Sequence, residues 1–140
     1  MSLFILMRMS GPVGIKLVIV SYTLSFENGL ILMVIAPCRK HTGKIAGGLC
    51  DNLLTCIVRA WDYTKPMFVA PAMNTFMWTN PFTERHLMVI DDLGISLIPP
   101  VTKRLACGDY GNGAMAEPSL IYSTVRLFFE NREQSSSGNI

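Results

Sequence analysis

The chain has 140 residues, of which 50% are hydrophobic and 16% are charged, and its formal net charge is +2. This length suits one domain, and a charged fraction below the ~25% typical of globular proteins excludes disorder throughout and a highly solvated repeat array. The small net charge gives no signal of polyanion binding, so we expect no nucleic-acid partner.

Apolar segments and turn residues alternate along the first half of the chain. Residues 1–29 contain a Gly/Pro turn and an apolar run, and they predict at most one strand and no helix. Residues 30–36 form a continuous apolar run ended by Pro37, which is typical of a strand buried on both faces. Residues 43–61 carry apolar side chains at helical spacing and predict one helix.

The second half repeats this strand–helix order twice. Residues 67–70 are a short apolar run closed by a proline, and residues 81–93 predict a helix that ends before a glycine. Residues 95–98 predict a third strand, and Pro118 opens a last helix that runs to about Glu130. We expect the polar tail that follows to be disordered.

This order of elements predicts right-handed crossovers and a parallel sheet. We therefore assign the chain to the α/β class, as a three-layer Rossmann-like parallel sheet with flanking helices and with its N-terminal strands and helices partly missing. One domain is expected over residues 1–133, atypical or truncated over residues 1–29, with residues 134–140 as the tail. Such sheets bind ligands beyond the carboxyl ends of their strands. The segments expected at that edge are residues 37–42, 71–78 and 99–113.

Membrane insertion, secretion and metal binding find no support in the sequence. No apolar run reaches the ~18 residues of a membrane span, and residues 1–7 lack the basic region and cleavage site of a secretory signal. We therefore expect no membrane partner. The cysteines have no spacing that a zinc site uses, so we expect no metal and interpret them mainly as reduced thiols of a cytoplasmic protein. They are Cys38, Cys50, Cys56 and Cys107.

Residues 71–78 read PAMNTFMW and follow the second predicted strand. The amide of Asn74 offers donors and an acceptor to a bound carboxylate or amide. The Met and aromatic side chains around it would form an apolar wall suited to a flat ring. Alternatively, Asn74 caps a helix and the aromatic side chains lie in the core. The spacing alone slightly favours this second interpretation.

Residues 105–116 read LACGDYGNGAMA, with three glycines around a cysteine. This composition predicts a loop whose backbone approaches a ligand closely. Cys107 lies near Lys103 and Arg104, which would lower its thiol pKa and make it an acid or a nucleophile. A surface turn with an incidental thiol is the alternative. We favour the functional role for Cys107, because a Gly-rich loop at the ligand edge rarely needs a cysteine for packing.

Residues 43–48 read GKIAGG but lack both the P-loop spacing and the GxGxxG fingerprint, which argues against a generic dinucleotide-binding domain. Backbone amides at the start of that helix could still receive a phosphate, or the Gly47–Gly48 pair serves close helix packing. His86 lies among ordinary surface charges and is predicted to be solvated. His41 lies at the ligand edge, and its contact with a ligand stays open.

Two of these segments carry a family resemblance. PAMNTFMW resembles the PxMNxxMW motif, and ACGD at residues 106–109 resembles the second signature, of the flavin-dependent cysteine decarboxylases. This family includes the phosphopantothenoylcysteine decarboxylases. Residues 43–126 closely resemble its plant halotolerance members, and MVIAP at residues 33–37 extends the resemblance.

The resemblance implies FMN-dependent decarboxylation of 4′-phosphopantothenoylcysteine to 4′-phosphopantetheine in coenzyme A biosynthesis, by a homotrimer. In the family, FMN oxidises the cysteinyl side chain to a thioaldehyde, carbon dioxide leaves, and the product is reduced again. Cys107 would be the catalytic residue that donates a proton in the reductive step. The substrate-binding residues implied are Asn74, Met77, Ala106, Gly108 and Asp109, and the cofactor-binding residues are Thr42, Ala72 and Met73.

The first third of the chain departs from the family. SGPVGIK at residues 10–16 resembles a shortened flavin-phosphate loop, and CRKHT at residues 38–42 is one residue shorter than its family counterpart, of which only Thr42 matches. The histidine that precedes residues 33–37 in relatives has no counterpart. We therefore interpret the chain as a truncated or mis-spliced decarboxylase with impaired activity. The alternative is a catalytically defective subunit or regulatory binding protein that assembles with intact relatives.

Overall fold

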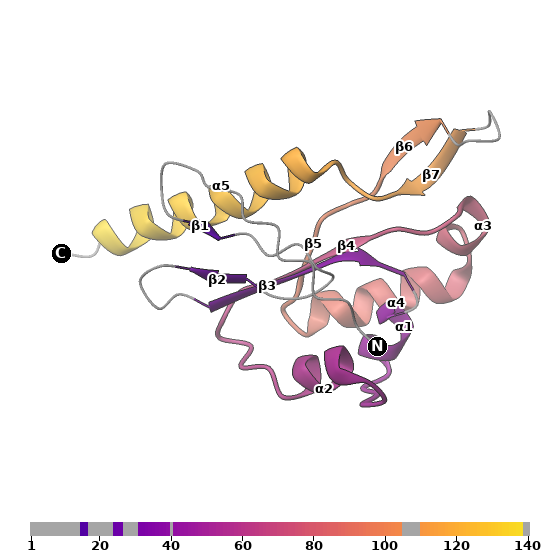
Figure 1. Ribbon diagram of the computed structural model, residues 1–140, viewed down its shortest axis with the longest axis horizontal. Coiled ribbons are helices and arrows are strands. Elements are labelled where there is room, and N and C mark those ends of the chain that lie inside the picture. The colour runs from indigo at the N-terminus through magenta and orange to yellow at the C-terminus, as the bar shows by residue number, and fades with distance from the viewer. Residues whose placement is uncertain (1–14, 17–23, 27–30, 40, 105–109, 139–140) are drawn as a thin grey trace.

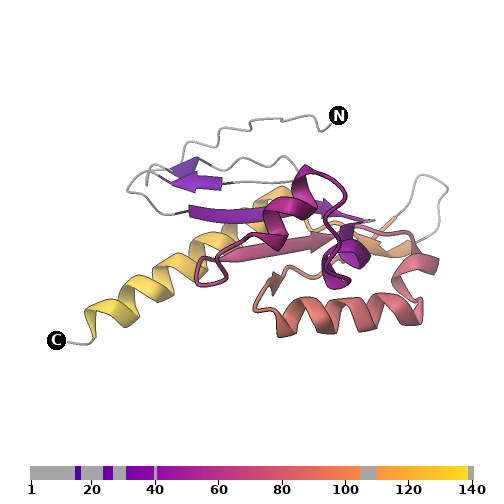
Figure 2. The same cartoon turned by 90° about the horizontal axis from the view of Figure 1, so that it is seen from below.

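The computed structural model describes residues 15–16, 24–26, 31–39, 41–104 and 110–138. Five strands form a central sheet in the order β1-β2-β3-β4-β5, with helices on both of its faces (Figures 1 and 2). The strands are β1 (Ile15–Lys16), β2 (Leu24–Phe26), β3 (Ile31–Cys38), β4 (Met67–Pro71) and β5 (Ser96–Leu97).

The middle of the sheet is parallel, as predicted. β3 pairs in parallel with β4, with Met33 opposite Met67, and β4 pairs in parallel with β5. β1 and β2 extend the edge beside β3 as antiparallel strands. The sequence predicts at most one strand in this region, and the structure contains two short ones.

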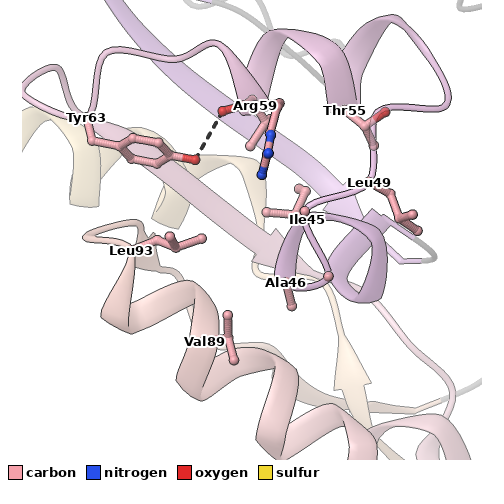
Figure 3. A pocket seen from close by; sticks show the side chains of 11 residues that line it. Ile45, Ala46, Leu49, Thr55, Arg59, Tyr63, Val89 and Leu93 are labelled. Atoms are coloured by element: carbon pink, nitrogen blue, oxygen red, sulfur yellow. Dashed lines mark hydrogen bonds between the residues drawn. The ribbon is translucent and has the colours of Figure 1, made fainter.

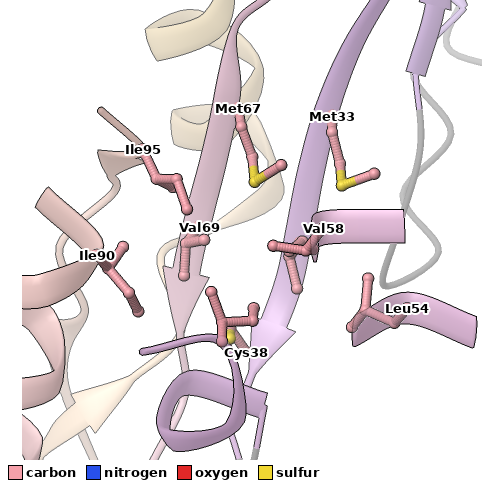
Figure 4. Close-up of a cluster of buried hydrophobic side chains, with 10 residues drawn as sticks. Met33, Cys38, Leu54, Val58, Met67, Val69, Ile90 and Ile95 are labelled. Carbon is pink, nitrogen blue, oxygen red and sulfur yellow. The ribbon is translucent and has the colours of Figure 1, made fainter. Parts of the chain in front are cut away.

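Two hydrophobic cores cover the two faces of the sheet, because successive side chains of a strand point to opposite sides. Leu32 and Val34 of β3 pack on the face covered by α5, together with Ile121 and Val125. Met33 and the other alternate residues pack on the opposite face (Figure 4). The helices on that face are α1 (His41–Ala46), α2 (Leu53–Arg59) and α4 (Pro81–Asp92), and the helix on the first face is α5 (Pro118–Ser137). The structure confirms the predicted three-layer α/β arrangement.

Residues 43–61 form two helices, and the prediction of a single helix is wrong. Gly48 follows α1 with φ of 70°, a conformation that ends a helix and suits glycine. Asn52 then begins α2 with a reciprocal cap, because its Oδ1 accepts from the Thr55 N–H at 2.9 Å while its own N–H donates to Thr55 Oγ1 at 3.0 Å. Apolar residues keep their helical spacing across this break, so periodicity alone does not reveal it.

The C-terminal third contains a hairpin that the sequence does not predict. β6 (Val101–Arg104) and β7 (Tyr110–Ala114) pair antiparallel in a second sheet. Residues 110–114, predicted as part of a loop, are therefore a strand. A strand that buries few side chains has no apolar alternation to reveal it.

The last helix is longer than predicted. α5 continues past Glu130 to Ser137, so residues 134–137, predicted to be disordered, form its last turn. Arg126 pairs with Glu130 one turn later at 2.8 Å, and the Ser135 hydroxyl donates to the Asn131 carbonyl at 3.0 Å. Local bonds thus extend the helix beyond the part that packs on the sheet. None of the helices in the described ranges is long and apolar enough to cross a membrane.

Candidate functional site

The segments that follow β3 and β4 meet at one edge of the sheet, as predicted. The Ala72 N–H donates to the Cys38 carbonyl at 3.1 Å, which joins the two segments directly. β7 comes to the same place, because the Met73 N–H donates to the Gly113 carbonyl at 2.8 Å. The candidate site is therefore built from three separate parts of the chain.

Asn74 caps the short helix α3 (Thr75–Trp78) at this edge. Its Oδ1 accepts from the Met77 N–H at 2.8 Å, which confirms the capping interpretation. The associated prediction that the aromatic side chains lie in the core is wrong, since Phe76 is 88% exposed and Trp78 is only half-buried. Because the backbone holds the amide oxygen, the NH₂ end of Asn74 is the group available to a ligand. Two N–H donors suit a carboxylate.

Two residues whose role no local sequence pattern indicates, Thr83 and Gly113, hold this turn in place. The Thr83 hydroxyl of α4 donates to the Met77 carbonyl and lies 3.8 Å from the Met73 sulfur. On the other side, a Cβ atom at Gly113 would lie 2.2 Å from the Met73 carbonyl oxygen. Glycine is thus needed at 113 for close approach of two backbones. The glycine-rich composition indicates such an approach, but not which segment is approached.

Four of the predicted site residues line one pocket of about 480 Å³. This volume is in the ~300–1,000 Å³ range of small-molecule sites. The predicted residues in its lining are Thr42, Met73, Asn74 and Met77. The others are Arg39, Gly43, Phe76, Asn80, Phe82, Thr83 and His86. Ala72, also predicted to bind the cofactor, is buried behind this surface.

His86 lies in the pocket and is half-buried, so the prediction of a solvated surface histidine is wrong. Its ring centroid lies 5.9 Å from that of Phe82. A Cβ atom at Gly43 would lie 3.1 Å from His86 Cε1, so the absence of a side chain on α1 makes room for the ring. His41 begins α1 but is not among the residues that line this pocket.

Thr42 and Cys38 form a closed pair. The Thr42 side chain is 1% exposed, and its Oγ1 lies 3.3 Å from Cys38 Sγ. Burial raises the pKa of the Cys38 thiol from its ordinary value of 9.0 to about 11, and the hydrogen bond with Thr42 opposes that rise. Cys38 is therefore a neutral thiol at pH 7. The Thr42 hydroxyl, which belongs to a predicted cofactor-binding residue, is engaged by Cys38.

Four predicted site residues lie outside the described ranges. They are Ala106, Cys107, Gly108 and Asp109. The hairpin pairs the two residues that flank this segment, with Arg104 opposite Tyr110. The catalytic role of Cys107 and the binding roles of its neighbours remain predictions.

Comparison with known proteins places these features in a family. The flavoprotein family model matches residues 19–130. Phosphopantothenoylcysteine decarboxylase HAL3a of Glycine max is 81% identical over 110 residues, which cover 78% of this chain and 52% of the relative. The phosphopantothenoylcysteine decarboxylase of Mus musculus is 50% identical over 96 residues, covering 68% and 47%. The chain thus spans about half the length of the curated relatives it matches.

Solved structures agree. A variant of PPC decarboxylase complexed with pantothenoylaminoethenethiol is similar with a TM-score of 0.68 and 79% identity, covering 71% of this chain and 55% of that one. The FMN binding protein AtHal3 is similar with a TM-score of 0.65, 79% identity and the same coverage. The resemblance indicated by the two sequence motifs is confirmed. Since the family match extends over most of its length, the chain belongs to the flavoprotein family.

Proposed function

We propose that the chain carries the substrate-binding part of an FMN-dependent decarboxylase that converts 4′-phosphopantothenoylcysteine to 4′-phosphopantetheine in coenzyme A biosynthesis. The observation that carries the proposal is the Asn74 turn, whose amide oxygen is bonded to the Met77 N–H while its NH₂ end is available to a carboxylate. Relatives 81% and 50% identical to this chain bear the name of that decarboxylase, which supports the same substrate.

The residues at and around the Asn74 turn have different roles in substrate binding. Asn74 donates to the substrate carboxylate, and Met77 adds apolar contact at the same turn. Thr83 and Gly113 keep the turn in position through their contacts with the residues next to Asn74. Cys107 is the proposed acid, with Ala106, Gly108 and Asp109 beside it in sequence as substrate-binding residues.

The side chains that line the pocket have the chemical character that FMN binding requires. Met73, Phe76 and Phe82 supply an apolar surface of the sort that holds a flat ring. Arg39 and His86 are basic side chains in the same lining and suit a ligand that bears a negative charge. Thr42, Ala72 and Met73 are the proposed cofactor-binding residues. FMN, when bound, supplies reversible two-electron oxidation of the substrate's cysteinyl side chain.

We further propose that the chain assembles as a homotrimer and acts in the cytoplasm. Phe82 and Met88 of α4 and Leu127 of α5 are exposed apolar side chains, which supports an interface. Free thiols at Cys38, Cys50 and Cys56 are in keeping with a reducing compartment.

One observation favours a second candidate function. The Thr42 hydroxyl is buried against Cys38, so this chain keeps a substrate-binding turn while a polar group of its proposed cofactor side is engaged internally. A catalytically defective subunit or regulatory binding protein that assembles with intact relatives would have these properties.

Reconstitution with FMN distinguishes the two functions. The purified chain is mixed with FMN, its absorbance spectrum is recorded after desalting, and conversion of 4′-phosphopantothenoylcysteine is followed by mass spectrometry. The decarboxylase proposal expects one retained flavin per chain and formation of 4′-phosphopantetheine, which Asn74→Asp abolishes. A colourless chain that forms no product but joins trimers of a co-expressed intact relative would establish the second function instead.

A further inference from the structure

A second cavity, of about 380 Å³, lies between the end of α1, helix α2 and the C-terminal part of α4 (Figure 3). It shares no lining residue with the pocket beside Asn74. At ~30 Å³ for each water molecule, this volume equals roughly a dozen waters. It lies in the ~300–1,000 Å³ range of ligand sites. The proposed decarboxylase function gives this cavity no role.

The cavity is lined by apolar and polar groups from three helices and the loops beside them. Ile45, Val58 and Val89 belong to α1, α2 and α4, while Leu49 and Leu93 lie just beyond helix ends. Val89, Leu49 and Leu93 are exposed to solvent although they are apolar. A ligand that covers them would remove apolar surface from water, which is favourable in proportion to the area covered.

The GKIAGG segment makes room for a charged group in this cavity. Gly47 and Gly48 both line it, and Gly48 has φ of 70°. A Cβ atom at Gly48 would lie 3.0 Å from Nη1 of Arg59, so a side chain there would displace the guanidinium. Figure 3 shows this guanidinium pointing from α2 into the space between Tyr63 and Ile45.

Arg59 has no carboxylate partner among the residues that the structure describes. The ion pairs in those ranges use Lys44, Lys65, Lys103 and Arg126 as their basic members. No Asp or Glu from the described part of the chain lines the cavity. The Tyr63 hydroxyl is also engaged, since it donates to the Val58 carbonyl at 3.0 Å. The cavity therefore combines an uncompensated positive charge with apolar walls.

We propose that this cavity binds a small amphipathic carboxylate, with its head group on Arg59 and its apolar chain of roughly five to seven carbons against Val58, Val89 and Leu93. A guanidinium pairs with a carboxylate through two parallel N–H···O bonds, which fixes the orientation of the head group. The apolar chain then covers Val89 and Leu93, which are otherwise in contact with water, and passes beside the buried Val58. This second site does not depend on the decarboxylase proposal.

The test is an NMR titration of the full chain with hexanoate and, separately, with hexanamide, its neutral isostere. Hexanoate is expected to shift the methyl resonances of Val58, Val89 and Leu93 with a dissociation constant on the order of 1–10 mM, as expected for so small a ligand. Hexanamide should bind about tenfold more weakly, because it lacks the charge-assisted pair.

Two variants of surface arginines sharpen the result. Arg59→Gln should weaken hexanoate binding about tenfold and bring it to the level of hexanamide. Arg126→Gln removes an equal charge from α5 and should leave binding unchanged. Both side chains are exposed, so both variants are expected to fold, which circular dichroism checks.

Three results would overturn the proposal. They are equal affinity for hexanoate and hexanamide, an Arg59→Gln affinity equal to that of the unaltered chain, and the absence of shifts at Val89 and Leu93 up to the solubility limit of the probe. A hexanoate affinity that falls as protein concentration rises would also overturn it, because a second copy of the chain would then be the occupant.

Discussion

The loops that follow β3 and β4 start side by side, yet they use their polar groups in opposite ways. Around the first loop, the thiol of Cys38, the last residue of β3, contacts the hydroxyl of Thr42 in α1, and both side chains are buried. After β4, Asn74 bonds to the first turn of its own helix, and Phe76 and Met77 beyond it are exposed. The Cys38–Thr42 pair is thus closed, although Arg39 beside it lines the pocket, whereas the loop after β4 presents its side chains to ligands. We call the first segment the closed loop and the second the open loop.

The difference shows that satisfying polar groups does not by itself decide whether a loop forms a site. Buried polar groups need partners, and the β3 loop meets that need by turning Thr42 inward. A helix cap also satisfies a polar group, but it uses only the oxygen of Asn74 and leaves the NH₂ end available. The substrate side of the candidate site is therefore preformed, whereas Cys38 and Thr42 are committed to the core.

Among the substitutions proposed, Gly113→Ala should destabilise the protein most, through the open loop after β4. The added methyl group would meet the Met73 carbonyl oxygen at 2.2 Å, and both atoms are tied to backbone. We expect the free energy of unfolding to fall by about 3 kcal/mol, the upper part of the range for overpacking. Urea denaturation measures the loss, and hydrogen exchange should show faster exchange of the Met73 N–H.

Gly138→Ala is the matched control for that substitution. A Cβ atom at Gly138 comes no closer than 3.6 Å to its nearest neighbour, the Gln134 carbonyl oxygen, so we expect a change in stability within about 0.5 kcal/mol. Equal stability of the two variants would show that β7 does not depend on close approach to the Met73 backbone.

The closed loop makes stability depend on alkaline pH. The pKa of Cys38 is raised by burial from 9.0 to about 11, so the folded state holds its proton more tightly than the unfolded state. This contribution to stability is complete below about pH 9 and is lost as pH rises through 11. At 1.36 kcal/mol for each pKa unit, it amounts to about 2–3 kcal/mol.

Urea denaturation between pH 8 and pH 11 is compared for the unaltered chain and Cys38→Ala. The variant should lose less stability over this range. The pKa of Tyr63 is also raised by burial, but that group is present in both proteins and cancels in the difference. If the stability of both proteins fell equally with pH, the Cys38 thiol would have to be in contact with water in the folded state.

The parts of the fold that the sequence predicts correctly are those specified locally. β3 and β4 are apolar runs next to prolines, and α4 begins at Pro81 and ends just before Gly94, which has φ of 86°. The break between α1 and α2 escapes prediction because apolar spacing continues across it. The β6–β7 hairpin escapes because β6 is polar and exposed and β7 is glycine-rich, so neither strand has apolar alternation.

The candidate site divides in the same way. Asn74 is found from its residue type and its place after a strand, since a cap needs only the next few residues. Gly113, Thr83 and His86 act on the site through contacts with segments distant in sequence, and no local pattern specifies such contacts. The glycines at 43 and 113 are informative only once the neighbour that each one approaches is known.

Asn74→Ala and Asn74→Asp separate the two roles of the open loop. Alanine removes the cap and should lower the free energy of unfolding by about 1 kcal/mol. Aspartate keeps an oxygen acceptor for the Met77 N–H and should leave stability near that of the unaltered chain. Both variants lose the NH₂ donors, so both should bind 4′-phosphopantothenoylcysteine at least about tenfold more weakly in calorimetry. If the aspartate variant bound 4′-phosphopantothenoylcysteine as tightly as the unaltered chain, Asn74 would not be a substrate-binding residue.

Thr42→Val should change the free energy of unfolding least. A small loss of stability is expected if the Thr42 hydroxyl contributes only through its contact with Cys38. The variant keeps the shape of the side chain and loses the hydroxyl, so we expect a cost of about 0.5–1 kcal/mol in urea denaturation. The pKa of Cys38 should rise further, because the hydrogen bond with Thr42 lowers it. Retention of FMN should not change, since the hydroxyl is bonded to Cys38 and Thr42 lines the pocket through its other atoms, which valine keeps in place. If Thr42→Val instead lost FMN while its stability stayed the same, the hydroxyl would have to turn outward when the cofactor binds, and the loop after β3 would be as open as the loop after β4.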